Sequence, residues 1–256
     1  FCHLLFPETE QLFALLEKAE KELLQVTFTF SYVREYQLVQ TEELLKKLGQ
    51  WCRKENRKLE IEINDWAMAD MMKSDFPELI PCYGRLLNKR KKDPRMAYKM
   101  GDHRLLEENS LNAEFYRDSL EQRFGITRFE WESCGYDMAF PVGKNSLHLP
   151  FYQTNTSQYC TLYAKCTTGE RGKQMLVKQC SGFCKDYAFL YPDHLKMLGR
   201  YNSLFALDSR IFDNDPGPGS GTENEVGTKT GIKEMFAKWK KAVRNSRKIW
   251  RQGFVY

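Results

Sequence analysis

The sequence predicts an α/β protein with a TIM-barrel-like fold, complete or distorted, and three observations lead to this fold class. Short runs rich in β-branched and aromatic residues alternate with helical patterns through the first half of the chain. One strand and the helix after it take about 30 residues, which is typical of parallel sheets with helical crossovers. The length of 256 residues fits a single barrel domain.

The expected elements follow one another in chain order. The first six residues are expected to form a strand remnant, after which Pro7 opens an amphipathic helix. Thr41, followed by two glutamates, is expected to cap the second helix. Asp65 leads into a third helix, and Gly125 ends a fourth. The other expected segments are strands 25–30, 58–64, 79–86, 126–131, 185–191 and 202–207, and helices 66–73 and 111–124.

Half of the eight cysteines lie in one short segment: Cys160, Cys166, Cys180 and Cys184. Thiolate is the soft ligand that zinc and iron–sulfur clusters select, so this segment predicts a metal centre. Buried thiols or two disulfides are the alternative, but the composition is not that of a disulfide scaffold. Spacing alone leaves zinc and iron–sulfur open, because the first pair is wider than zinc sites favour and the repeated C-x2-C of common ferredoxins is absent.

Polar side chains gather where the predicted strands end, which is where barrel proteins carry their chemistry. We expect a substrate pocket lined by this set: Asn64, Asp65, Arg85, Asn88, Glu130 and His148, with Glu132 beside them. Each residue also has a plainer interpretation when it is taken singly. Asp65 is suited to cap a helix, Arg85 to a solvated loop, and His148 to a hydrogen-bonded place in the core.

Several pieces of the sequence resemble one known family. They are LEIEINDWAMADMM, IPCYGRLLNKRKKDPR, ITRFEWE and SLHLPFYQTNTSQYC, followed by the later cysteines. In this order they resemble the collagenase-like peptidases (the U-thirty-two group), and within that group the UbiU/UbiV-type iron–sulfur proteins. The resemblance implies a TIM-barrel-like fold, a [4Fe–4S] cluster on four cysteines, and either oxygen-independent hydroxylation or modification of RNA bases.

The resemblance also implies particular ligands. Three cysteines match the family's late pattern of one cysteine followed by C-x3-C: Cys166, Cys180 and Cys184. The early fourth ligand of UbiV-like proteins has no counterpart in the matching region 28–34, which lacks a cysteine. Cys160 is therefore the expected replacement, and Cys134 is the alternative.

The functional expectation follows from the resemblance and from what is missing. The sequence has no Ser/His/Asp or Cys/His arrangement and no H-E-x-x-H, so proteolysis is not expected. We expect an iron–sulfur oxidoreductase or hydroxylase component that modifies a small or RNA-borne substrate without oxygen, together with a partner subunit. The alternative is a zinc-stapled barrel that serves as a binding or adaptor protein without catalysis.

The location of the protein is expected to be cytoplasmic. No apolar run approaches the roughly 20 residues of a membrane span. No signal-peptide pattern is evident, and the cysteines read as free thiols of a reducing compartment.

The composition changes after a predicted barrel domain of residues 1–212. Residues 213–230 are rich in Gly, Pro and polar residues, which predicts a flexible linker. Residues 231–256 predict a basic amphipathic helix, with Phe236 and Trp239 on its apolar stripe. We expect this helix to bind a partner protein or a second copy of the chain; docking on its own barrel is the alternative.

Overall fold

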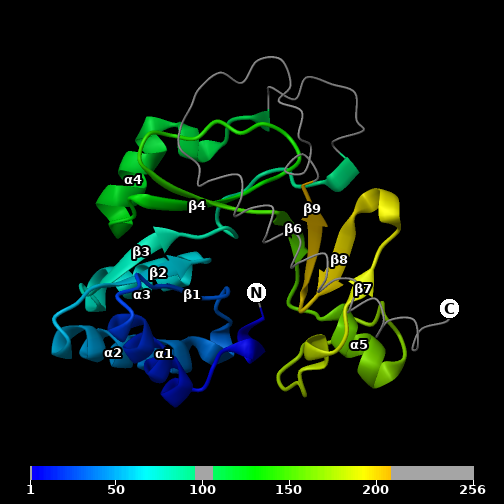
Figure 1. The fold of residues 1–256 in the computed structure, drawn as a ribbon, viewed down its shortest axis with the longest axis horizontal. Helices are drawn as coiled ribbons and strands as arrows, with labels where there is room; N and C mark the ends of the chain where they lie inside the picture. Colours follow the sequence, from blue (N-terminus) through cyan, green and yellow to red (C-terminus); the bar gives the residue numbers. More distant parts are fainter. Residues whose placement is uncertain (1, 96–105, 209–256) are drawn as a thin grey trace. The chain divides into compact units, whose positions relative to one another are not determined.

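The structure is a computed structural model that describes residues 2–95 and 106–208. These residues belong to one compact unit, Phe1–Phe212 (Figure 1). The predicted linker, 213–230, and the predicted basic helix, 231–256, lie outside the described residues. Among the helices that the structure describes, none is both long and apolar enough to cross a membrane.

The first sheet is parallel throughout and alternates with helices along the chain. Its strands, in spatial order, are β1 (Thr27–Thr29), β2 (Leu59–Ile63), β3 (Leu79–Tyr83), β4 (Arg128–Glu132) and β5 (Lys144–His148). The helices are α1 (Thr9–Lys21), α2 (Leu38–Lys54), α3 (Trp66–Asp75) and α4 (Glu114–Phe124). Figure 1 shows the sheet curled into half a barrel. The predicted α/β class is confirmed, and the curvature is compatible with a distorted barrel.

Strand β2 shows why this sheet has one apolar face and one polar face. Successive side chains of a strand point to opposite faces. Ile61 and Ile63 are fully buried in a core that they share with residues of α1, α2 and α3. Glu60 and Glu62 alternate with them and bond instead to threonines of β1. The concave face of the half-barrel is therefore polar.

The second sheet is antiparallel, so the predicted repeat of parallel strands stops at β5. It consists of β6 (Phe151–Thr156), β9 (Ser203–Leu207), β8 (Met197–Arg200) and β7 (Phe189–Leu190) in spatial order, with α5 (Thr161–Thr168) following β6 in the chain. Only Leu149 and Pro150 separate β5 from β6. A parallel connection needs a crossover of about a dozen residues or more, so β6 has to leave the first sheet.

Two predicted helix ends are confirmed by their local chemistry. The Asp65 carboxylate accepts the Met68 backbone N–H at 2.9 Å and caps α3. Gly125 ends α4 with a φ of +69°, which glycine adopts without the strain that a Cβ would bring.

Other predicted boundaries are wrong. The expected strand at the start is a 3-10 turn, η1 (His3–Leu5), because a short apolar run bounded by proline fits either structure. Thr41 lies inside α2, which already begins at Leu38. Most of the strand expected at 185–191 is irregular, with a 3-10 turn, η6 (Phe183–Lys185), at its start.

Candidate functional site

Four cysteines line one small cavity beside η1, near the start of the chain. They are Cys2, Cys160, Cys180 and Cys184, and the cavity encloses about 30 Å³. One water needs roughly 10–15 Å³ by the same measure, so the cavity has room for more than a single water. Three of these cysteines were expected at a metal centre, and the structure brings them together.

Local structure explains how Cys180 and Cys184 come to face the same space. Gly182 lies between them with a φ of +84°, a conformation that L side chains rarely adopt. The Cys180 sulfur accepts the Gly182 N–H at 3.3 Å, which holds this tight turn. Cys184 then falls inside η6 and is buried.

Cys160 and Cys166 stand at the two ends of the same short helix. Cys160 caps α5: its sulfur accepts the Tyr163 N–H at 3.4 Å and its thiol donates to the Tyr201 carbonyl at 3.0 Å. Cys166 lies six positions further on, a rotation of about 240° at 100° per residue. The two side chains therefore face different directions, and Cys166 is not among the residues that line the cavity.

The thiols nevertheless form one electrostatic group centred on Cys180. Burial raises the pKa of four thiols, and the neighbouring Cys180 raises each of them further: Cys2, Cys160, Cys166 and Cys184. Raised values are the opposite of what a nucleophilic cysteine needs, because the thiolate is the reactive form. The raised values therefore argue against nucleophilic catalysis, and ligation would require a metal to displace the thiol protons.

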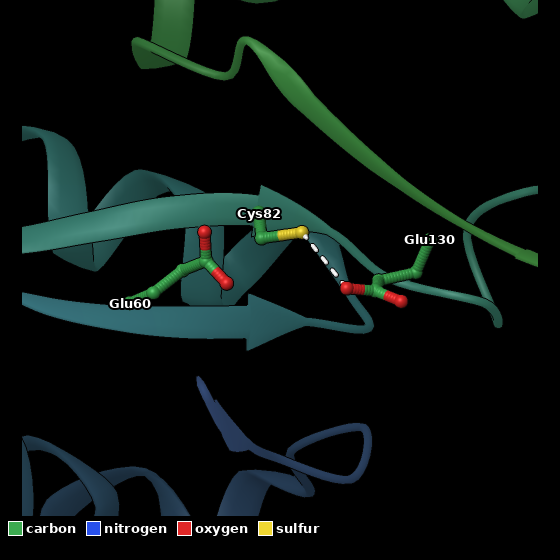
Figure 2. A group of neighbouring side chains, drawn as sticks. All are labelled: Glu60, Cys82 and Glu130. Carbon is green, nitrogen blue, oxygen red and sulfur yellow. Dashed lines mark hydrogen bonds between the residues drawn. The ribbon is translucent and has the colours of Figure 1, made fainter. Parts of the chain in front are cut away.

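The concave face of the first sheet carries a second group with metal-binding geometry. One ligand atom from each of Glu60, Cys82 and Glu130 lies within 4.8 Å of the other two (Figure 2). The Cys82 sulfur is 3.7 Å from a Glu130 carboxylate oxygen. Burial, together with the charges of Glu130 and Glu62, raises the pKa of the Cys82 thiol.

A cation of the protein itself already lies among these three residues. The Arg128 guanidinium pairs with Glu60, and its second nitrogen is 2.7 Å from Glu130 and 2.5 Å from the Ser146 hydroxyl. Arg128 also approaches the Cys82 sulfur at 3.7 Å. A metal ion here would have to displace a paired guanidinium, so the cysteine-lined cavity is the better candidate metal centre.

Further ion pairs extend along the concave face. Arg85 pairs with Glu62 at 3.3 Å and with Glu132 at 3.7 Å, and Lys92 reaches Glu132 at 2.6 Å. All these carboxylates are buried, so each pair is shielded from the water that weakens surface ion pairs.

The Glu130 carboxylate is the most connected of the group. The His148 ring nitrogen lies 2.5 Å from one of its oxygens. Burial opposes ionisation of Glu130, but the hydrogen bond of His148 and the charges of Arg128 and Arg85 outweigh it and lower its pKa. Glu130 is therefore a carboxylate held in its charged form.

The six predicted substrate-binding residues divide into two groups. Arg85, Glu130 and His148 converge on the concave face, as the ion pairs above show. The other three form hydrogen bonds to the backbone. The Asn64 amide donates to the Phe30 carbonyl and accepts the Leu86 N–H, and the Asp65 carboxylate accepts the N–H groups of Val33 and Met68. The Asn88 amide donates to the Glu130 carbonyl.

Sequence reasoning missed Cys2 and the inward glutamates of β2. The glutamates had a readable signal, because Glu60 and Glu62 alternate with Ile61 and Ile63. Cys2 had none, since nothing local connects it to the cysteines of the later segment. Cys134, the alternative fourth ligand, is buried beside Tyr136 and does not line the cavity.

A larger cavity of about 370 Å³ shares wall residues with the cysteine cavity and also touches the polar face of the first sheet. Its walls include Cys2, Leu5 and Tyr201, which also line the cysteine cavity, and Arg85 and Thr29 of the polar face. Its apolar wall is formed by Phe6, Phe28 and Phe205. Small-molecule pockets usually measure roughly 300–1,000 Å³, so this space is large enough for one.

Comparisons of the chain with known protein families, curated proteins and solved structures found no match.

Proposed function

We propose that this protein holds a [4Fe–4S] cluster in the cysteine-lined cavity and takes part in oxygen-independent modification of a small substrate in the adjoining cavity. The observation that carries the proposal is that one space of about 370 Å³ is walled by Cys2 and by Arg85. A substrate there would lie against the ligand set on one side and the charged concave face on the other. The resemblance to UbiU/UbiV-type proteins supports the same reading.

The proposed ligands are Cys2, Cys180 and Cys184, with a fourth from α5. Cys160 lines the cavity but its thiol already caps α5, whereas Cys166, rotated by about 240° around the helix, does not line it. The helix cannot direct both toward one centre. We therefore revise the expected set, which contained Cys160 and Cys166 together, by adding Cys2 and retaining one of the two.

The choice of a cluster over a single zinc ion rests on the resemblance to UbiU/UbiV-type proteins, which implies a [4Fe–4S] centre on four cysteines. Thiolate ligands suit both centres. Metal analysis of the purified protein separates the two.

When bound, such a cluster supplies one-electron redox chemistry or a Lewis-acidic iron. The residues of this chain have separate tasks around it. The phenylalanine wall of the larger cavity offers packing surface to an apolar substrate, while Arg85, paired with Glu62 and Glu132, presents a fixed guanidinium at the polar end. Buried Glu130 pairs with half-buried His148 on the same concave face.

Anaerobic purification with an absorption spectrum and iron and sulfide analysis tests the proposal. We expect about four irons and four sulfides per chain for a [4Fe–4S] cluster. Alanine variants of Cys2, Cys180 and Cys184 should each lose most of the iron, and only one of Cys160→Ala and Cys166→Ala should do so. Cys52→Ala, which alters a buried thiol of α2, is the matched control and should keep it.

Three results would contradict or revise this proposal. Zinc without iron in the anaerobic wild-type protein would favour the zinc-stapled adaptor instead. Full iron content in Cys2→Ala would exclude Cys2 as a ligand, and the ligands would then all lie within residues 160–184. Binding of RNA without binding of small aromatic probes would move the substrate class to RNA.

A further inference from the structure

Arg34 is an almost fully buried arginine in the wall of the cysteine cavity. It follows β1, its exposed fraction is 7%, and it lines the same cavity as the four cysteines. Two of its nitrogens bond to backbone: Nη2 donates to the Gln158 carbonyl at 2.7 Å and Nη1 to the Val177 carbonyl at 3.5 Å. Those carbonyls also belong to residues of the cavity wall.

One polar atom of this guanidinium is unsatisfied. Arg34 Nε is buried and has no hydrogen-bond partner. Nη1 also donates to the Tyr36 hydroxyl at 3.3 Å, so the other end of the group is well bound. A buried donor to which nothing binds is unfavourable by about 1–3 kcal/mol, and such groups in native proteins call for an explanation.

The charge of Arg34 is also uncompensated. In the part of the chain that the structure describes, its partners are carbonyls and tyrosine hydroxyls, and no carboxylate pairs with it. Burying a cation without a counter-charge is strongly unfavourable.

We propose that Arg34 is the counter-cation of the cluster, and that its Nε–H donates to a sulfur of the thiolate-bound group. This inference rests on the proposed function. Four thiolates give a [4Fe–4S] centre a negative charge that grows on reduction, and a nearby cation favours the reduced state. A guanidinium is suited to this place because it stays charged when buried and is weakly hydrated. Arg34 would thus set the reduction potential of the centre.

The test compares Arg34→Gln, Arg34→Lys and the exposed Arg123→Gln, each purified anaerobically as the full chain. We expect the midpoint potential of the cluster to become more negative in Arg34→Gln. The lysine variant should lie between the glutamine variant and the wild type, because it keeps the charge but not the planar donor. Arg123→Gln removes the same charge from the surface of α4 and should leave the potential unchanged.

A measurement on the wild-type protein covers the case in which Arg34→Gln does not fold. Pulsed electron paramagnetic resonance of the reduced protein, labelled with 15N-arginine, should show coupling to an arginine nitrogen that disappears in Arg34→Lys. A wild-type cluster without this coupling overturns the inference, as does an Arg34→Gln cluster with unchanged potential. If the wild-type protein contains no iron at all, the proposed function itself is wrong and this inference falls with it.

Discussion

At the scale of single residues, Glu130 shows what the concave face is built to do. Its carboxylate contacts Arg128 and His148, and it lies beside the Cys82 thiol. A carboxylate whose pKa is lowered is a weak base near neutral pH, so Glu130 is suited to hold charges in place rather than to move protons. The Cys82 thiol, with its raised pKa, is equally unsuited to act as a nucleophile.

Glu130→Gln should destabilise the fold by roughly 1–3 kcal/mol at neutral pH, because Arg128 and His148 lose a charged partner. The native pKa of Glu130 lies below its usual value of 4.5, so its contribution to stability is complete above that pH and is lost as the pH falls through the native value. Urea unfolding at about pH 7 and about pH 3 measures this, and the difference between variant and wild type should shrink in acid. An equal difference at both pH values would contradict the role.

Gly84 is a residue at which only glycine fits. An alanine Cβ would lie 2.3 Å from the Ile63 carbonyl oxygen and 2.4 Å from the Asn64 side-chain oxygen. Gly84→Ala should therefore cost about 1–3 kcal/mol through a shift of the backbone that carries Arg85. Gly172→Ala is the matched control, since nothing lies within 4 Å of its added Cβ and its φ is not positive. Thermal unfolding of both variants tests this, and equal melting temperatures would show that the contact relaxes freely.

At the scale of elements, the N-cap residue Asp65 connects α3 to the segment that follows β1. The Asp65 carboxylate accepts the Met68 N–H inside the helix and the Val33 N–H, at 2.6 Å, in the segment that follows β1. One side chain therefore caps α3 and also binds the loop after β1. That loop leads directly to Arg34 and hence to the cysteine cavity.

Asp65→Ala should lower the free energy of unfolding by about 1–2 kcal/mol, as expected for loss of a helix cap. Asp65→Asn should recover much of it, because the amide oxygen still accepts a hydrogen bond. Asp70→Ala alters an exposed carboxylate of the same helix and should change stability by less than about 0.5 kcal/mol. Chemical unfolding of the three variants is the measurement; a loss as large in Asp70→Ala would point to helix charge rather than capping.

The elements also show how far sequence can predict this structure. Asp65 and Gly125 act within one turn of the chain, and their roles follow from local chemistry alone. Thr41 has the right chemistry for a cap, but α2 starts a turn earlier, at Leu38. The place of Cys2 depends on contacts between distant segments, and no local pattern encodes it.

At the scale of the whole molecule, two sheets of different type share one compact unit, Phe1–Phe212. The length of the chain and the β-then-α repeat predicted the parallel sheet correctly. They did not predict its end, because this depends on a direct connection through Leu149 and Pro150 rather than on strand propensity. The metal ligands and the partner remain predictions from the sequence and the cavities.

Deleting residues 213–256 should leave the melting temperature of the remaining chain nearly unchanged, because Phe1–Phe212 is compact by itself. The sequence predicts that the deleted part binds a partner or a second copy through Phe236 and Trp239, so the truncated chain should associate less. Light scattering and thermal unfolding of both chains give the answer. An insoluble truncated chain would show that these residues belong to the fold.

The cysteine cavity takes its wall from both ends of the described chain, and this orders the steps of biosynthesis. Cys2 leaves the ribosome first, but Cys180 and Cys184 follow only after every strand of the parallel sheet has been made. A nascent chain therefore cannot present the complete set of thiols to any metal donor while the half-barrel is still being synthesised. For the proposed cluster, loading would therefore be a late event, and a chain truncated before Cys184 would lack one of the proposed ligands.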